Sequence, residues 1–293
     1  MTPPVVVLGP TASGKSDVAM SAARAVTGTE IVAVDAMQVY RGMDIGTAKP
    51  TPADRAAVVH HCLDLVDPWQ EFNVTDYQQA YRQAVSTIDG QALLVAGTGL
   101  YLVAVLDGLD IPGQWPELRS QLEGDAADLY ARLRALDPVA AGRIDPSNER
   151  RIVRALEVTI GSGRPFSSFG PGVAAHPSTD ATVIGLRWPR PLLLRRIEQR
   201  VRSMIAAGLV EEVRRLQAAR PLSRTARQAL GYKELLTARD VPTAVEAIMT
   251  RTQQFAVRQE RWFRRDPRVR WVDVTHDPVA EVAPAVIDAL RQP

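Results

Sequence analysis

Short apolar runs alternate with longer amphipathic stretches along the first hundred residues of this 293-residue chain. Three of these runs are rich in valine, isoleucine and leucine, as in strands that are buried on both faces; they occupy residues 5–8, 31–34 and 92–95. Residues 17–26 and 76–88 have the spacing of helices, and Thr75 is the expected N-cap of the second one. The alternation of strands and helices predicts a parallel α/β sheet.

The pattern changes after residue 110. A linker with two prolines and a glycine is expected at 111–116. Short helical patterns without intervening strands follow it, at 117–123, 126–136, 138–144 and 148–160. We therefore expect residues 1–110 to form the first part of an α/β core and residues 111–175 to form a mainly helical insertion.

Residues 176–293 are expected to complete the core. Two strand patterns occupy residues 182–186 and 270–274. Three longer helical patterns lie at 192–219, 225–238 and 244–265. The last part of the chain thus returns to the sheet and adds long helices to it.

Charge is distributed unevenly, although the net charge is only +2. Residues 1–110 hold six basic and twelve acidic residues, whereas 187–227 hold eleven arginines and three glutamates. Residues 251–270 add seven arginines and two acidic residues. Two explanations remain open at this point: a polyanionic partner, or solvated helix faces.

Cysteine usage and hydropathy limit the cellular setting. Cys62 is the only cysteine, which excludes a disulfide within the chain and fits a reducing cytoplasm. No apolar run approaches the roughly 18–20 residues that span a bilayer. We expect a cytoplasmic protein without a membrane segment.

The loop after the first strand matches G-x-x-x-x-G-K-[ST] at every position. It consists of Gly9, Pro10, Thr11, Ala12, Ser13, Gly14, Lys15 and Ser16. Such a loop surrounds phosphate oxygens with backbone N–H groups, and the following helix adds partial positive charge. We expect Lys15 to neutralise a di- or triphosphate and Ser16 to bind Mg²⁺. The predicted fold is a P-loop NTPase-like parallel sheet flanked by helices, with a helical insertion domain.

Two further polar residues follow predicted strands. Asp35 ends the second strand and Thr98 follows the third, between two glycines. Ligands of open α/β sheets bind at the carboxyl ends of strands, so both residues should face the phosphate loop. A carboxylate there could act as a general base or bind magnesium through water. The alternatives are that Asp35 only caps the following turn and that Thr98 is a helix N-cap.

Several motifs, in order along nearly the whole chain, resemble the bacterial tRNA dimethylallyltransferases, also called tRNA isopentenyltransferases. Besides the phosphate loop, the most specific is the block from Asp-x-x-Gln-Val-Tyr to Gly-Thr-Ala-Lys-Pro, within residues 34–50. Gly-Thr-Gly-Leu-Tyr at 97–101 adds to it. Further matching segments lie at 137–144, 150–158, 230–234 and 258–263.

The resemblance implies transfer of a dimethylallyl group from dimethylallyl diphosphate to N6 of adenine 37, beside the tRNA anticodon. It implies that the phosphate loop binds the leaving diphosphate, with Arg214 as a further contact. It also implies that Asp35 is the general base and that Thr98 assists. The positions matched to tRNA contacts are Asp35, Ala36, Met37, Gln38, Arg119, Arg150, Arg151 and Arg154. A monomer is expected.

The chain departs from the family pattern at three positions. Ala36 stands where the pattern has serine, and Gln253 and Val257 stand where the last long helix usually has basic residues. These departures question specific phosphate or RNA contacts but leave Asp35 and Thr98 unchanged. The residues by themselves leave three other functions open. These are a P-loop kinase of a small metabolite, a prenyltransferase acting on free AMP, ADP or ATP, and a non-enzymatic nucleotide-switch or RNA-binding module.

Overall fold

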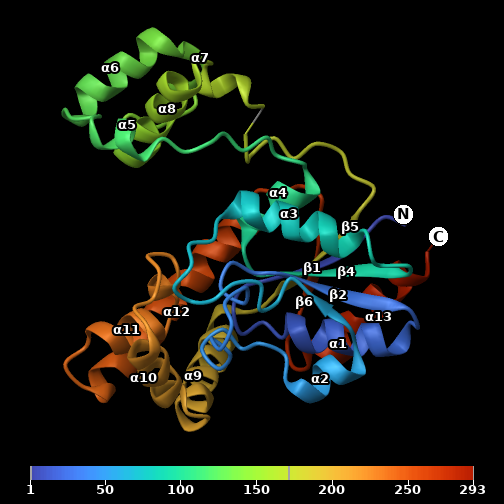
Figure 1. Ribbon diagram of the computed structural model, residues 1–293. Helices are drawn as coiled ribbons and strands as arrows, with labels where there is room; N and C mark the ends of the chain where they lie inside the picture. The colour runs from blue at the N-terminus through green and yellow to red at the C-terminus, as the bar shows by residue number, and fades with distance from the viewer. Residues whose placement is uncertain (1, 171, 293) are drawn as a thin grey trace. The chain divides into compact units, whose positions relative to one another are not determined.

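A computed structural model describes residues 2–170 and 172–292 of the chain. Within them, six strands form one parallel sheet in the order β3-β2-β4-β1-β5-β6 (Figure 1). The strands are β1 (Val5–Leu8), β2 (Thr29–Val34), β3 (His60–His61), β4 (Gln91–Ala96), β5 (Thr182–Arg187) and β6 (Val269–Asp273). The prediction of a parallel α/β sheet is confirmed. Because the strands are parallel, the loops that follow β1, β2 and β4 emerge at one edge.

Helices cover both faces of the sheet. On one face, α1 (Lys15–Ala25), α13 (Pro278–Arg291) and α9 (Arg190–Ala206) pack on the side chains of Val5 and Val7. On the other face, α3 (Val74–Val85) and α4 (Gly99–Leu106) pack on Val6 and Leu8. Alternate residues of β1 thus supply both hydrophobic cores, which explains why its sequence is apolar throughout.

The remaining helices of the same unit are α2 (Pro52–Ala57), α10 (Leu209–Ala219), α11 (Tyr232–Thr237) and α12 (Val241–Phe263). Among the described residues, no helix combines the length and the apolar character needed to cross a bilayer.

Residues Asp107–Pro177 form a second compact unit. Its helices are α5 (Pro116–Ser120), α6 (Ala126–Leu136), α7 (Pro138–Ala141) and α8 (Glu149–Ser162). A separate hydrophobic core holds α6 and α8 together, with Leu133 and Ile152 fully buried at its centre. A core of its own is the property expected of an inserted domain.

Two of the predicted long helices are interrupted by glycines in the left-handed region. The pattern over 192–219 is divided between α9 and α10 at Gly208, whose φ is 98°. In the pattern over 225–238 the α-helix is confined to α11, which starts after Gly231 with a φ of 90°, and a short 3₁₀ helix occupies Ala226–Gln228. Apolar spacing continues across both glycines, so the periodicity alone did not reveal the turns.

Other local predictions were incomplete or wrong. The N-cap of α3 is Asn73 rather than Thr75, because its side chain accepts the N–H groups of Thr75 and Asp76, at 2.8 and 3.3 Å. The Asp76 carboxylate accepts the Asn73 N–H in return, at 2.9 Å, which completes a capping box. The short elements α2, β3 and α4 and the C-terminal α13 were not predicted.

Candidate active site at the carboxyl ends of β1, β2 and β4

The phosphate loop has two left-handed residues, Ala12 with φ 63° and Gly14 with φ 90°. Gly14 also lies against Pro278, since a Cβ at Gly14 would come within 2.5 Å of the proline ring. Both backbone conformation and space therefore require glycine there. α1 begins at the next residue, Lys15. The N–H groups of its first turn have no partner within the helix and can bind an anion.

Two side chains that follow β5 in the sequence donate hydrogen bonds to carbonyls of this loop. The Trp188 indole N–H donates to the Ser13 carbonyl at 2.9 Å, and Arg196 Nε donates to the Ala12 carbonyl at 2.8 Å. The Arg196 guanidinium also stacks on the Trp188 ring, 4.6 Å from its centroid. These contacts stabilise the loop before any ligand binds.

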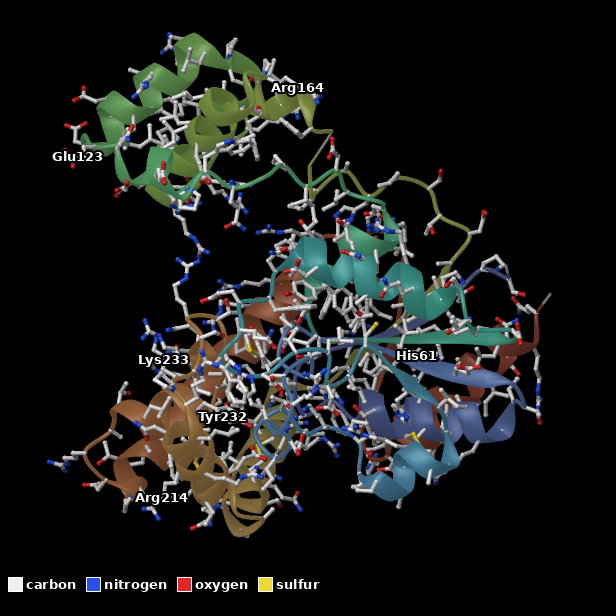
Figure 2. All side chains as sticks on the ribbon, viewed as in Figure 1. His61, Glu123, Arg164, Arg214, Tyr232 and Lys233 are labelled. Carbon is white, nitrogen blue, oxygen red and sulfur yellow. The ribbon has the colours of Figure 1, made fainter. Side chains whose placement is uncertain are left out.

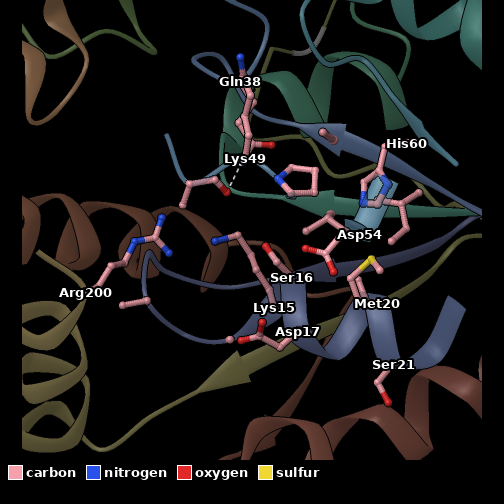
Figure 3. Close-up of a pocket in the computed structure, with 18 of the residues that line it drawn as sticks. Lys15, Ser16, Asp17, Met20, Ser21, Gln38, Lys49, Asp54, His60 and Arg200 are labelled. Carbon is pink, nitrogen blue, oxygen red and sulfur yellow. Dashed lines mark hydrogen bonds between the residues drawn. The ribbon is translucent and has the colours of Figure 1, made fainter. Parts of the chain in front are cut away.

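A cleft of about 790 Å³ adjoins the loop (Figure 3). Its cationic part contains Lys15, Arg196 and Arg200, and the exposed Ser16 lies beside Lys15. Burial and the neighbouring Arg200 lower the pKa of Lys15 from 10.5 to about 8. Lys15, Arg196 and Arg200 repel one another, and Asp17 and Asp35 offset this repulsion only in part, so this part of the cleft is suited to a polyphosphate.

The cleft continues over the sheet, where apolar side chains line it beside the polar Asp54 and His60. Ile31 and Ala33 of β2 and Val95 of β4 line it, together with Met20 of α1. Ala33 and Val95 are direct neighbours in the parallel register. Figure 3 shows Arg200 and Met20 toward opposite ends of the drawn pocket, with Lys15 and Ser16 between them. The same cleft can therefore hold an anionic group and a small hydrocarbon.

Asp35 and Thr98 are brought together by the loop after β2. Asp35 Oδ1 accepts the N–H groups of Met37, at 2.8 Å, and Gln38, at 3.3 Å. The Ala36 N–H donates to Thr98 Oγ1 at 3.1 Å. Asp35 therefore does cap its turn, but with one oxygen, and the other oxygen faces Gly97. A Cβ at Gly97 would lie 3.0 Å from Asp35 Oδ2, so the small residue leaves room for the carboxylate.

Further contacts hold the rest of this loop. Gln38 Nε2 donates to the carbonyls of Thr47, at 3.1 Å, and Ala48, at 3.3 Å. The buried Glu212 of α10 accepts the N–H groups of residues 44–46, at 2.9–3.2 Å. Tyr232 donates its hydroxyl hydrogen to the same carboxylate. The conformation of residues 35–50 thus depends on helices nearly two hundred residues away in the sequence.

Arg214 is not placed with the phosphate loop. Its side chain is exposed on α10 and lines a separate hollow of about 160 Å³. Figure 2 shows Arg214 in the lower part of the view, in the region of α10 and α11. Because the chain turns at Gly208, α10 does not continue the face of α9 that reaches the loop. Arg196 and Arg200 of α9 lie instead in the cleft beside the phosphate loop, where Arg214 was expected. They are four residues apart and therefore on one helix face.

The four arginines of the insertion unit that were expected to contact tRNA fall into two pairs. Arg119 and Arg154 form ion pairs with the buried Glu157, at 3.2 and 3.0 Å. Arg150 and Arg151 are exposed in the first turn of α8. The first pair thus has a structural partner already, whereas the second pair is accessible to a ligand.

Gln259 of α12 was not predicted as a site residue, although it is buried and contacts the phosphate loop and the end of β4. Glu212 was not predicted either. A polar residue on the apolar face of a helical pattern was the available signal in both cases.

Family models and related proteins identify the same kind of transferase. A family model described as IPP transferase matches residues 38–266, and one described as isopentenyl transferase matches residues 5–65. The chain is 47% identical to a tRNA dimethylallyltransferase from Pseudarthrobacter chlorophenolicus, covering 93% of this chain and 94% of that protein. It is 44% identical to one from Moorella thermoacetica, covering 99% and 95%.

A solved structure is similar along its full length. It is the tRNA isopentenylpyrophosphate transferase of Bacillus halodurans, with 31% sequence identity and a TM-score of 0.71, over 99% of this chain and 97% of that one. The P-loop NTPase-like fold expected from the sequence is therefore confirmed.

Proposed function

The chain belongs to the IPP transferase family of tRNA dimethylallyltransferases, and on that premise we propose that it transfers a dimethylallyl group from dimethylallyl diphosphate to N6 of adenine 37 in tRNA. The products are N6-dimethylallyladenosine and diphosphate. The main support is the cleft beside the phosphate loop, where Lys15, Arg196 and Arg200 adjoin apolar side chains of β2 and β4. Asp35 and Thr98 follow these two strands, and the Ala36 N–H connects their loops.

Asp35 is the general base of this proposal. The adenine N6 amine is a weak nucleophile because its lone pair is delocalised into the ring. It must lose a proton as the bond from N6 to C1 of the dimethylallyl group forms, and a carboxylate within hydrogen-bonding reach accepts that proton. With Oδ1 held by two backbone N–H groups, Oδ2 remains for the amine.

The departing diphosphate gains negative charge as the bond from C1 to oxygen breaks. Lys15, Arg196 and Arg200, together with the N–H groups of the loop, would stabilise that charge. The exposed hydroxyl of Ser16 would be one oxygen ligand of Mg²⁺, which would neutralise charge on the diphosphate when bound. The described residues contain no cluster of three acidic, histidine or cysteine side chains, so the diphosphate itself would supply further ligands.

The substrate tRNA would enter at the loop after β2. The target adenine must leave its stack to reach Asp35, and base extrusion of this kind costs a few kcal/mol. Residues 36–38 lie directly beside Asp35 and would contact the extruded nucleotide. Arg150 and Arg151 of the insertion unit would bind phosphates of the anticodon stem-loop. The protein would act as a monomer, in the cytoplasm where tRNA is found.

One incubation tests the proposal. The protein is mixed with Mg²⁺, dimethylallyl diphosphate and unmodified tRNA, and the digested tRNA is analysed for N6-dimethylallyladenosine by mass spectrometry. A parallel reaction contains AMP instead of tRNA. We expect product on tRNA at position 37 and none on AMP; product on AMP alone would assign the enzyme to free adenylates.

The base assignment has its own test. Asp35→Ala should abolish measurable turnover, since a positioned base contributes about 10²–10⁴-fold. Binding of tRNA should change only a few-fold, because the phosphate contacts stay intact. Near-normal turnover of Asp35→Ala would refute the role of Asp35.

A further inference from the structure

One amide side chain joins the phosphate loop to the loop that bears Thr98. Gln259 is buried near the C-terminal end of α12, with 7% of its surface exposed. Its Oε1 accepts the backbone N–H of Thr11 at 2.8 Å. Its Nε2 donates to the carbonyl of Gly97 at 2.7 Å. Both ends of the amide are therefore used, one on each loop.

These partners fix the orientation of the amide. A backbone N–H can only donate and a backbone carbonyl can only accept, so oxygen must face Thr11 and nitrogen must face Gly97. A glutamate at position 259 could keep the contact with Thr11 but would place an acceptor against the Gly97 carbonyl. A leucine of similar volume would leave both backbone groups without their partner.

The contact with Gly97 positions the neighbouring residue. The N–H groups of Gly97 and Thr98 donate to the Val34 carbonyl, at 3.1 and 3.2 Å. Trp262 lies one turn after Gln259 and packs on Gly99, where a Cβ would come within 2.2 Å of the indole. α12 thus contacts the loop on both sides of Thr98.

We propose that Gln259 is a positioning residue that holds the phosphate loop and the Asp35–Thr98 pair at the separation needed for prenyl transfer. The inference rests on the function proposed above. The diphosphate is bound by one loop and the proton is removed beside the other, so the distance between them sets how C1 meets N6. Displacements of about 1 Å can reduce turnover about 10²-fold.

The first test compares Gln259→Leu and Gln259→Glu with Gln254→Leu, an exposed glutamine on the same helix. We expect the Gln259 variants to lower kcat by about 30- to 300-fold, in line with the cost of misplaced reacting groups. The KM for tRNA and the affinity for inorganic pyrophosphate should change by less than about threefold, because Trp188 and Arg196 still hold the phosphate loop and Gln259 itself touches neither substrate. Gln254→Leu should behave as wild type.

A double-mutant cycle with Thr98→Val distinguishes a specific effect on the Thr98 loop from a loss of kcat by partial unfolding. If Gln259 acts through the Thr98 loop, Gln259→Leu should lower kcat by less than about threefold when Thr98 is already replaced. Circular dichroism at the assay temperature establishes that each variant is folded.

Three results would overturn the inference: a kcat of Gln259→Leu close to wild type, an equal fold-loss in both backgrounds, or a loss confined to KM. Each can be observed only if the wild-type protein prenylates tRNA. Failure of the wild-type reaction would instead refute the proposed function.

Discussion

The hydroxyl oxygen of Thr98 accepts a 3.1 Å hydrogen bond from the backbone N–H of Ala36. This bond connects the end of β4 to the loop that follows β2. Position 36 has lost the serine expected from the family pattern, but its main chain makes the contact. The departure at Ala36 therefore leaves the connection between the two strand ends intact.

Thr98→Val should lower kcat by about 10- to 100-fold, because a half-buried N–H loses its acceptor at a cost of about 1–3 kcal/mol. Thr98→Ser keeps the hydroxyl and should retain activity within about threefold, as should Ala36→Ser, since neither removes this hydrogen bond. Steady-state prenylation of tRNA measures all three variants. A Thr98→Val enzyme as active as Thr98→Ser would show that the bond is dispensable.

The depressed pKa of Lys15 predicts how ligand-free stability depends on pH. With a pKa of about 8 in the folded protein and an ordinary value of 10.5, the unfolded chain binds more protons between these values. The free energy of unfolding of wild type should therefore rise with pH over this window, relative to Lys15→Met. Below pH 8 the charged lysine is unfavourable in the empty cleft, so Lys15→Met should melt at a higher temperature at pH 7. Thermal melting from pH 7 to 10 measures this difference.

The same lysine predicts the pH dependence of ligand binding. Pyrophosphate favours the protonated amine, so binding above pH 8 requires uptake of a proton. The affinity advantage of wild type over Lys15→Met should shrink by up to about tenfold per pH unit there. Isothermal titration calorimetry in buffers of different ionisation enthalpy detects the proton. The comparison with Lys15→Met removes the titration of pyrophosphate itself, and a constant advantage would contradict the assignment.

Glu212 should contribute to stability through its contacts with residues 44–46. Glu212→Gln replaces an acceptor of three N–H groups by an amide with one oxygen, which should cost about 1–3 kcal/mol of unfolding free energy. Tyr232→Phe should cost less, since the carboxylate keeps its backbone donors. Urea denaturation measures both, and the exposed neighbour Glu211→Gln is the matched control. Equal stability of Glu212→Gln and Glu211→Gln would argue against this anchor.

The arginines of the insertion unit should separate into two kinds of effect. Arg150→Ala and Arg151→Ala should each weaken tRNA binding and reduce the salt dependence of log K by about 0.7–0.9, the value for one phosphate contact. Arg154→Ala should mainly lower the stability of the insertion unit, because it removes a partner of the buried Glu157. Binding titrations at several salt concentrations, together with thermal melting, distinguish the two effects. If Arg150→Ala left the salt dependence unchanged, its phosphate contact would be excluded.

Local patterns in the sequence were sufficient where one segment determines its own structure. The apolar run at 5–8 became β1, and the residues from Gly9 to Ser16 formed a phosphate loop between a strand and a helix. Residues 126–136 became α6 with the expected bounds. In each case the side chains that define the pattern also make the contacts that stabilise the element.

Tertiary contacts decided which helix supplies the cations near the phosphate loop. Arg196, Arg200 and Arg214 all lie within one predicted helix, and only the left-handed turn at Gly208 separates their positions in space. Glycine tolerates positive φ but does not require it, so the sequence could not specify this turn.

The amino-acid pattern was enough to predict the parallel sheet, the phosphate loop and the placement of Asp35 and Thr98 at strand ends, because hydrophobic periodicity and loop geometry are local properties. The tertiary structure decided that Gln259 and Glu212 hold the site together, from 162 and 168 residues away along the chain. A buried polar side chain obtains its hydrogen-bonding partners only when distant segments meet, and the amino-acid pattern around it records the burial but not the partner.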